Sequence, residues 1–354
     1  MTIKVISWNI SWGSMQLDTN DGTSKTLVEH CQKKSGHIYP TSQCLLNVVE
    51  TINTVNDGTV DFIATQESSS KWEDIFNRIN RKHSNLGYIH HKGGRFYDFA
   101  TFYNKRKYQA IKFKHGNITS GPDDRPYQLI HFKNHESGNP LYFINLHLGH
   151  RLDKHFVEQV FKTDIDNNKW KSITSENIKN GDQISENIEE QFNNSTPLIV
   201  CGDFNDYKNN FWEELDIAGT KIKSKAPPNT CCQGKINLRS TQNIDPWIGD
   251  YILYSTHFNP IQEYKMLLRG NNLDAETFPT SDHLPVMSIL STEPPAAGPE
   301  QGGYKTVNKT YRESLKTKKS HKSRKLRKSR KLRKSRKLRK SRKLRKSRKS
   351  NKTR

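Results

Sequence analysis

The chain has 354 residues and a formal net charge of +22, a length that suits one large domain or two ordinary ones. The charge is concentrated at one end: Lys305–Arg354 holds 27 of the 58 basic residues and a single acid, a net +26, which leaves −4 for the rest. This distribution excludes a uniformly basic globular protein and indicates a mildly acidic body followed by a polycationic tail.

The sequence contains no sign of membrane insertion or export. No apolar run approaches the roughly 18 residues of a membrane span, and the first residues, MTIKVISWNI, lack the features of a signal peptide. The five cysteines are an odd number without CxxC spacing, which favours buried free thiols in a reducing compartment. A zinc site from Cys31, Cys44 and the Cys231–Cys232 pair is the alternative. We expect an intracellular monomer, cytoplasmic or nuclear, with no transmembrane segment.

Short apolar, β-branched runs of strand length recur along the body, each bounded by polar or turn residues. In chain order these predicted strands are Lys4–Ile10, Asp61–Thr65, Phe99–Asn104, Tyr127–Phe132, Leu141–Leu148, Leu198–Cys201, Asp250–Ser255 and His283–Leu290. Apolar residues at helical spacing predict helices around Leu45–Val55 and Trp72–Ile79, and weaker patterns predict them at Lys154–Thr174, Asn187–Asn193 and Phe211–Ile217. Many strands with interspersed helices predict a layered α/β domain with two packed sheets and helices outside.

The remaining segments are predicted to be irregular. Gly13–Gln43 is polar and is expected to be a loop insertion after the first strand. The domain is expected to span residues 1–292, followed by a Pro/Gly-rich linker at 293–304. Within residues 305–354, KSRKLR repeats from Lys322 with a period of six, which spreads the leucines around any helix, so the tail is predicted to be disordered.

Polar, metal-competent residues follow or interrupt the predicted strands. The motifs are VISWN, FIATQE, FINLHL, LIVCGDFND, WIGDYIL and TSDHLPV, with Asp250 expected at a strand start. Singly, each has an ordinary explanation, because Asn, Asp and Glu at strand ends usually form turns or caps, and a histidine in an apolar run usually belongs to the core. Six such segments in order are an improbable product of turn chemistry, and they indicate side chains that converge on one rim.

The ordered series SWN, TQE, NLHL, GDFN, GDYIL and SDHLPV resembles the endonuclease/exonuclease/phosphatase (DNase I-like) superfamily. The resemblance covers almost the whole body, and GDFN and SDHLPV are its most specific motifs. It implies a four-layer α/β sandwich, in which two packed mixed β-sheets are flanked by helices and the site lies at one edge of the sheets. It also implies a metal-dependent phosphodiesterase, a hydrolase of phosphoester bonds.

The chemistry of that reaction suggests which residues hold a metal. Mg²⁺ prefers oxygen ligands and keeps several waters, so one or two carboxylates suffice. Glu67 is the first candidate ligand, with Asn9 beside it and Asp282 as a further contributor. We expect Mg²⁺ as the cofactor, with Mn²⁺ as the alternative.

The same resemblance suggests the catalytic residues. An imidazole is the natural base for activating water near neutral pH, and a carboxylate can fix its tautomer, which assigns His283 as the base and Asp250 as its partner. Asp203 lies where the family places an acid that orients the nucleophile or protonates the leaving oxygen. Asn205 and His147 would donate to phosphate oxygens, with His147 as an alternative general acid.

Four further residues are candidate phosphate contacts. Arg95 and Tyr97 lie in GRFYDFATFYNK, which resembles the family's strand after the glutamate, and His150 and Arg151 follow NLHL. The alternatives are exposed loop residues for the first pair and a helix cap for the second.

The substrate is not specified by these motifs. PWIGDYIL lacks the Trp-Cys-Asp-Arg sequence of inositol phosphatases, and no membrane anchor of the neutral-sphingomyelinase kind is visible. The tail would bind DNA or RNA non-specifically, so nucleic acid is the preferred substrate and partner, for a nuclease or end-processing enzyme. An enzyme on phosphoinositides or other phospholipids, held to anionic membrane by the tail, is the alternative. A nuclear-localisation signal and a solubilising extension are other roles for the tail, and a degenerate binding scaffold is the non-enzymatic alternative.

Overall fold

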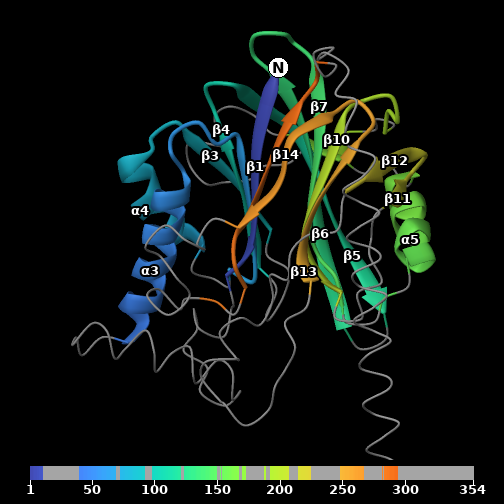
Figure 1. Ribbon diagram of the computed structural model, residues 1–354. Helices are drawn as coiled ribbons and strands as arrows, with labels where there is room; N and C mark the ends of the chain where they lie inside the picture. Colours follow the sequence, from blue (N-terminus) through green and yellow to red (C-terminus); the bar gives the residue numbers. More distant parts are fainter. Residues whose placement is uncertain are drawn as a thin grey trace, which may run out of the picture. The chain divides into compact units, whose positions relative to one another are not determined.

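A computed structural model describes the residues that build two sheets and their helices (Figure 1). The described residues are 1–10, 40–68, 72–91, 98–120, 123–149, 152, 154–166, 170–172, 187–188, 192–206, 214–224, 248–266, 281 and 283–293. The chain divides into two compact units, Met1–Pro294 and Pro295–Arg354. All described residues lie in the first unit, so the predicted linker and tail lie almost wholly outside them.

The first sheet has six strands and mixed pairing. Its order is β14 (Asn259–Met266), β15 (Val286–Ser291), β1 (Thr2–Asn9), β2 (Phe62–Gln66), β4 (Phe99–Asn104) and β3 (Leu86–His91). Strands β1 and β2 are parallel, with Val5 opposite Phe62 and Asn9 opposite Gln66, and the other pairs are antiparallel. The carboxyl ends of β1 and β2 therefore meet at one edge of this sheet.

The second sheet has nine strands. Its order is β11 (Glu214–Ile217), β12 (Thr220–Lys223), β13 (Ile248–Ser255), β10 (Leu198–Asp206), β7 (Pro140–His147), β6 (Asp123–Asn134), β5 (Tyr108–Ser120), β8 (Trp170–Ser172) and β9 (Asn187–Ile188). Strands β10 and β7 are parallel, and the other pairs are antiparallel. Asp203 lies opposite His147 on one side and Asp250 on the other.

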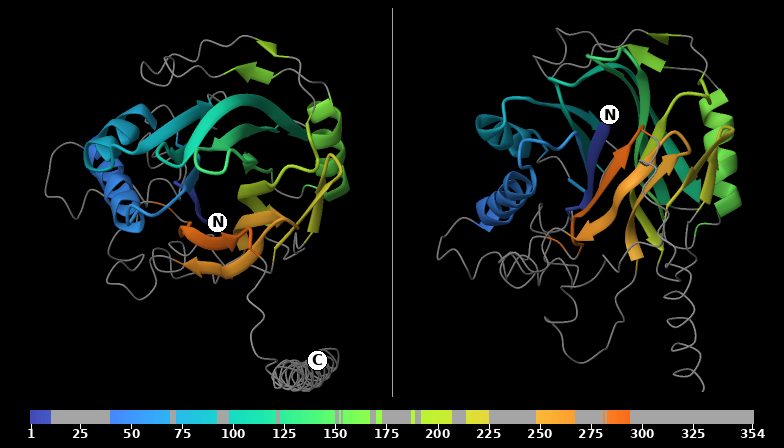
Figure 2. Two further views of the ribbon diagram at one scale, coloured as in Figure 1. Left: turned by 90° about the horizontal axis from the view of Figure 1, so that it is seen from above. Right: turned by 45° about the horizontal axis from the view of Figure 1, so that its top comes forward.

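Three apolar clusters separate four layers, which confirms the predicted four-layer α/β sandwich. Inward residues of both sheets, such as Val5, Phe62 and Phe143, form the central core. The outer face of the first sheet packs against α3 (Pro40–Val55) and α4 (Trp72–Lys82), and that of the second against α5 (Lys154–Asp166). Figures 1 and 2 show α3 and α4 on one side of the two sheets and α5 on the other.

Three of the helix predictions require correction. Phe211–Ile217 was expected to be helical, but Glu214–Ile217 is β11, because Ala218 and Gly219 adopt positive φ angles of 48° and 87° that close a tight hairpin to β12. The helix expected at Lys154–Thr174 ends at Asp166, since Trp170–Ser172 pairs with β5 as β8. Asn187–Ile188, expected to begin a helix, instead pairs with β8.

Some strand and loop boundaries also differ from expectation. Asp250 is the third residue of β13 rather than its start. Strand β15 begins at Val286 rather than His283, since Pro285 has no N–H for the ladder. Helix α3 begins at Pro40, inside the predicted Gly13–Gln43 loop, whose residues before Pro40 lie outside the described part. Within the described residues, no helix has the length and hydropathy that a membrane span requires.

Candidate active site

The candidate site lies at the edge where parallel strands of both sheets end. β1 ends at Asn9, β2 is followed by Glu67, and β7 ends at His147. Asp203 lies beside His147 on β10 and Asp250 lies beyond it on β13. Because side chains alternate along strands, residues in register within a sheet share a face and a level, and these groups from five of the six motifs lie at one rim.

The backbone turns sharply at Glu67, whose φ of 56° is in the left-handed region. Hydrogen bonds hold both flanking residues: Ile10 N–H donates to Gln66 O at 2.9 Å, and Ser68 N–H donates to Asp98 O at 2.8 Å. A non-glycine residue in this region is strained unless its surroundings over-determine it. The anchored neighbours therefore fix the direction in which the Glu67 carboxylate leaves the strand.

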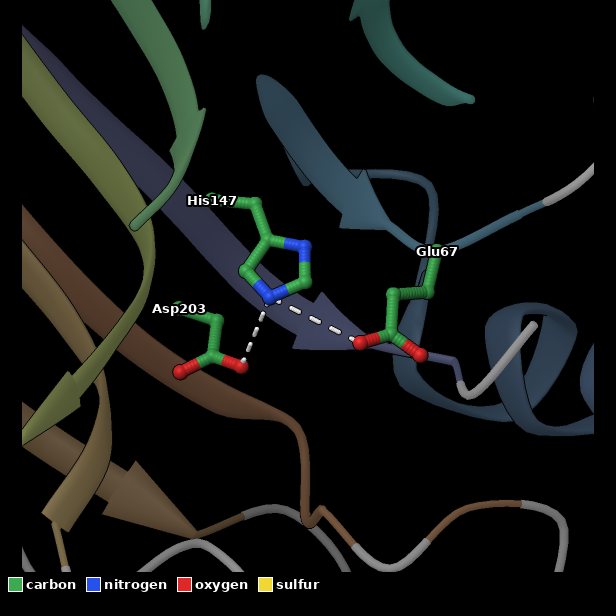
Figure 3. A group of neighbouring side chains, drawn as sticks. All are labelled: Glu67, His147 and Asp203. Atoms are coloured by element: carbon green, nitrogen blue, oxygen red, sulfur yellow. Dashed lines mark ion pairs between the residues drawn. The ribbon is translucent and has the colours of Figure 1, made fainter. Parts of the chain in front are cut away.

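Glu67, His147 and Asp203 form one compact group (Figure 3). His147 Nε2 lies 3.6 Å from both Glu67 Oε1 and Asp203 Oδ2. Asn9 Nδ2 links the two acids, donating to Glu67 Oε1 at 3.1 Å and to Asp203 Oδ2 at 2.9 Å. Three of the four side chains are buried, and Glu67 is partly exposed, so solvent reaches the group from the Glu67 side.

The donor atoms of this group can hold a divalent cation. Arg125 Nη1 lies 3.2 Å from His147 Nε2, and since arginine has no acceptor, that contact requires an Nε2 lone pair. One lone pair and two carboxylate oxygens then lie within 4.8 Å of one another. The two carboxylates lie close enough together to favour a cation between them, in addition to the Arg125 guanidinium beside His147. Asn9 now presents its nitrogen to the acids, so it would have to rotate its amide to ligate an ion.

Asp203 is buried and in contact with several charges. The pKa of Asp203 is raised to about 7, chiefly by burial; the charge of His283 acts to lower it, and the neighbouring Asp250 carboxylate acts to raise it. Donation from Asn9 and from the Asn205 backbone lowers it. An acid with a pKa near 7 exchanges protons at neutral pH, which suits the predicted roles of orienting a nucleophile or protonating a leaving oxygen.

The ring of His283 is held between two acids. Its Nδ1 lies 2.9 Å from Asp250 Oδ2, and its Nε2 lies 3.7 Å from Asp203 Oδ2. Because a carboxylate accepts, Nδ1 carries a proton and a neutral ring keeps its lone pair on Nε2, which faces the Glu67–His147–Asp203 group. The backbone of His283 is fixed as well: Trp8 Nε1 donates to its carbonyl at 3.1 Å, and its N–H donates to Ser281 Oγ at 3.0 Å.

Asn205 braces Asp203 in this structure. Its backbone N–H donates to Asp203 Oδ1 at 2.8 Å, and its side-chain amide donates to Leu148 O at 2.8 Å. The residue adopts a φ of 49° and is 7 % exposed. Its predicted contact to a phosphate oxygen stays a prediction. Next to it, Asp206 accepts from the Tyr251 hydroxyl at 2.7 Å and lies outside the catalytic group.

Sequence reasoning missed Arg125, which is 7 % exposed at the start of β6 and contacts His147. The only signal was a basic residue just before an apolar run, a pattern that usually indicates a solvated strand end. Five other predicted site residues lie outside the described part of the chain, so their roles stay predictions: Arg95, Tyr97, His150, Arg151 and Asp282. Cys201 is a buried free thiol, whereas the cysteines of the alternative zinc site fall where no side chain is described.

Comparison with known proteins gives the family of the sequence. Residues 6–283 match the sequence family described as the Endonuclease/Exonuclease/phosphatase family. An uncharacterized protein, L684, of Acanthamoeba polyphaga mimivirus is 26 % identical over 307 residues, which cover 81 % of this chain and 50 % of that protein. The chain thus spans about half the length of this curated relative.

Solved structures share the fold at low sequence identity. A humanized D. rerio TDP2 superposes with a TM-score of 0.50 and 13 % identity, covering 82 % of this chain and 99 % of that one. A conserved protein of unknown function from Enterococcus faecalis V583 also gives a TM-score of 0.50, with 15 % identity over 82 % of this chain and 100 % of that one.

Proposed function

Because the chain belongs to the endonuclease/exonuclease/phosphatase family, we propose that it is a magnesium-dependent phosphodiesterase that cleaves nucleic acid. Family membership and the Glu/His/Asp group indicate a hydrolase of phosphoester bonds that uses a divalent metal. The observation that carries the proposal is the position of His283. Its Nε2 points to the metal-competent group, while its Nδ1 is held by Asp250 at 2.9 Å.

This geometry supports a base for water activation. His283 Nε2 takes the proton of the attacking water, and the Asp250 carboxylate stabilises the resulting imidazolium through the Nδ1–H bond. Asp203, with a pKa of about 7, is positioned to give a proton to the departing oxygen or to orient the water. Arg125 supplies positive charge and hydrogen-bond donors for phosphate oxygens at the same rim, and its contact with His147 Nε2 holds that ring in place.

A bound divalent cation would neutralise charge on the phosphate, and Glu67 with an oxygen of Asp203 or Asn9 would hold it. Mg²⁺ takes oxygen ligands, with Mn²⁺ as its usual substitute, whereas a site made for zinc relies more on imidazole and thiolate. Two carboxylates and an amide beside a single imidazole therefore favour Mg²⁺ or Mn²⁺.

The case for nucleic acid rests on charge. Residues 1–304 have a net charge of −4, whereas Lys305–Arg354 has a net charge of +26. A charge of that size is enough to bind a polyanion without base recognition. A phosphoinositide or another phospholipid presented by an anionic membrane is the alternative substrate, since the same tail would bind such a surface.

The test is hydrolysis by the full chain with Mg²⁺ of four substrates: plasmid DNA, single-stranded DNA, RNA and phosphoinositide vesicles. We expect strand cleavage that chelator abolishes and that His283→Ala removes. The matched control is His257→Ala, because His257 is an exposed histidine bonded to Ser255 away from the site. Release of inositol phosphate without cleavage of nucleic acid would reject the preferred substrate. Full turnover by His283→Ala would reject the assigned base.

A further inference from the structure

A buried layer of polar side chains lies one level below the candidate site, between the two sheets. Gln66 on β2 and Thr101 on β4 come from the first sheet, and Gln128 on β6 and Asn145 on β7 come from the second. All four are 0 % exposed. Apolar residues form the core below this layer, so four buried polar side chains here require a reason beyond packing.

The layer is connected by side-chain hydrogen bonds across the sheet interface. Gln66 Nε2 donates to Asn145 Oδ1 at 2.8 Å, and Thr101 Oγ1 donates to Gln128 Oε1 at 2.8 Å. Asn145 Nδ2 lies 3.2 Å from Thr101 Oγ1 and 3.2 Å from Ala100 O. The network thus joins β2 and β4 to β6 and β7 directly beneath the catalytic rim.

The direction of the central bond is determined by its surroundings. The carbonyls of Ala100 and Thr65, 3.2 and 3.3 Å from the Asn145 amide nitrogen, can only accept. The Asn145 nitrogen must therefore face them, which leaves its oxygen for Gln66. Gln66 consequently has to present its nitrogen, so the bond has one donor and one acceptor that cannot be exchanged.

Both ends of this bond adjoin the candidate active site. Gln66 directly precedes Glu67, at the sharp turn where φ is 56°. Asn145 lies two residues before His147 and shares its face of β7, because side chains alternate along a strand. One hydrogen bond therefore joins the strand that carries the candidate metal ligand to the strand that carries its imidazole neighbour.

We propose that Gln66 and Asn145 are positioning residues, which hold Glu67 and His147 at the separation that the metal site requires. The inference rests on the proposed function, because it assigns Glu67 to metal binding. A buried, directional bond between two sheets fixes their spacing more sharply than apolar packing does, since apolar contacts tolerate small slides. Outer residues that orient metal ligands typically change metal affinity by about 10–100-fold when removed.

The test is metal affinity measured without substrate. The full chain is titrated with Mn²⁺, and the unfolding midpoint is followed to obtain the half-saturating concentration. Gln66→Met keeps the shape of the side chain and removes the donor. The matched control is Thr65→Val, which removes one buried hydrogen bond, from Thr65 Oγ1 to Ala100 O at 3.0 Å, from the opposite face of the same strand.

We expect Gln66→Met to raise the half-saturating Mn²⁺ concentration about tenfold or more, and Thr65→Val to leave it within about twofold. Equal shifts in the two variants would mean that both act through stability, and no shift in Gln66→Met would mean that the bond positions nothing; either result overturns the assignment. If Gln66→Met does not fold, Gln66→Asn, which keeps an amide with shorter reach, must show the same rise. A wild-type chain that Mn²⁺ does not stabilise would instead reject the metal site of the proposed function.

Discussion

Asp203 and Asp250 lie opposite each other on β10 and β13, and His283 contacts both carboxylates through different ring nitrogens. The two contacts differ: Nδ1 is hydrogen-bonded to Asp250 at 2.9 Å, whereas Nε2 is 3.7 Å from Asp203. Asp250 is 0 % exposed and Asp203 is 1 % exposed, so little water screens the pair. The arrangement therefore predicts distinct roles for the two acids, with Asp250 orienting the ring and Asp203 acting on the substrate.

Replacement of Asp250 tests the first role. Asp250→Asn keeps an oxygen that can accept from His283 Nδ1 but removes the negative charge that stabilises the imidazolium. We expect kcat on nucleic acid to fall about 10²–10⁴-fold with a small change in KM, because a base contributes in the transition state. Steady-state kinetics on the Mg²⁺-loaded full chain measures this, with Asp206→Asn as the buried control on β10. A KM effect alone would contradict the assignment.

Replacement of Asp203 tests the raised pKa of this acid through the pH dependence of the free energy of unfolding. Burial raises its folded pKa to about 7, above the value of 3.8 in an unfolded chain, so the folded state binds this proton more tightly. Its contribution is therefore favourable at low pH and is lost as pH rises from about 4 to 7. Relative to wild type, Asp203→Asn should gain stability between pH 5 and pH 8, by about 2–3 kcal/mol at most, since only the two pH units from 5 to about 7 contribute.

Urea unfolding in chelator at pH 5 and pH 8 measures that difference. Asp57→Asn is the control, because hydrogen bonds to Thr59 and Lys4 lower the Asp57 pKa to about 2 despite partial burial. Its stability contribution is lost only as pH falls through about 2, so this variant should show no change between pH 5 and pH 8. If the difference in unfolding free energy between Asp203→Asn and wild type is the same at pH 5 and pH 8, the pKa of Asp203 is not raised.

Much of the fold and most of the candidate site could be predicted from sequence, because both depend on local patterns. Strand periodicity placed polar residues at the strand ends, and the family resemblance gave them roles; the structure brings Asn9, Glu67, His147, Asp203 and His283 to one rim. The strands that were missed have weak patterns. β5 (Tyr108–Ser120) carries Lys112 and Lys114 among its apolar residues, yet both lysines are buried. Lys112 lies over the Trp170 ring, a contact that spacing does not reveal.

Pairings between distant segments could not be predicted. Gln66 and Asn145 are 79 residues apart and lie in different sheets, and no periodicity links them. Arg125 reaches His147 only because β6 and β7 are antiparallel neighbours whose ends meet at the rim. Such contacts depend on how two sheets face each other, which is a property of the whole packing rather than of any one segment.

Replacement of Glu67 tests the metal site directly. Glu67→Gln keeps the size of the side chain but removes a charge, so the Mg²⁺ concentration for half-maximal activity should rise at least about tenfold. Excess Mg²⁺ should restore part of the activity, because the remaining ligands still offer a site. Glu158→Gln on α5 is the control, since Glu158 is remote and bonds the Asp216 backbone N–H. An unchanged Mg²⁺ requirement would exclude Glu67 as a ligand.

A glycine in β10 is required by close packing beneath the site. A Cβ on Gly202 would lie 1.9 Å from the Leu146 carbonyl oxygen, a backbone atom of β7 that cannot move aside. Gly202→Ala should therefore separate β10 from β7 and destabilise the fold by roughly 3 kcal/mol or more. Gly58 also has a positive φ, 83° against 154° at Gly202, but an added Cβ there would meet no atom within 4 Å, so Gly58→Ala should cost only about 1–2 kcal/mol. Urea unfolding of both variants separates steric overlap from backbone strain, and equal losses would contradict the packing argument.

Removal of the tail tests the preferred substrate. The body carries −4 and residues 305–354 carry +26, so truncation after Pro294 should remove most of the attraction to DNA. Binding through phosphate contacts releases counterions. A protein that makes six to ten such contacts therefore binds about 10³–10⁵-fold more weakly at about 200 mM salt than at about 50 mM. We expect the full chain to bind duplex DNA with a steep salt dependence and the truncated chain to bind weakly with a shallow one.

The control for truncation is hydrolysis of a small phosphodiester probe with a single negative charge, bis(p-nitrophenyl) phosphate, whose rate should not change because the probe is too small to engage the tail. Loss of that rate would mean that residues after Pro294 support the catalytic unit itself. Equal DNA binding with and without the tail would end the tethering proposal, whereas tail-dependent binding to anionic vesicles but not to DNA would favour the phospholipid alternative. Because a polycation binds either surface with a steep salt dependence, which of the two surfaces requires the tail for binding decides between them.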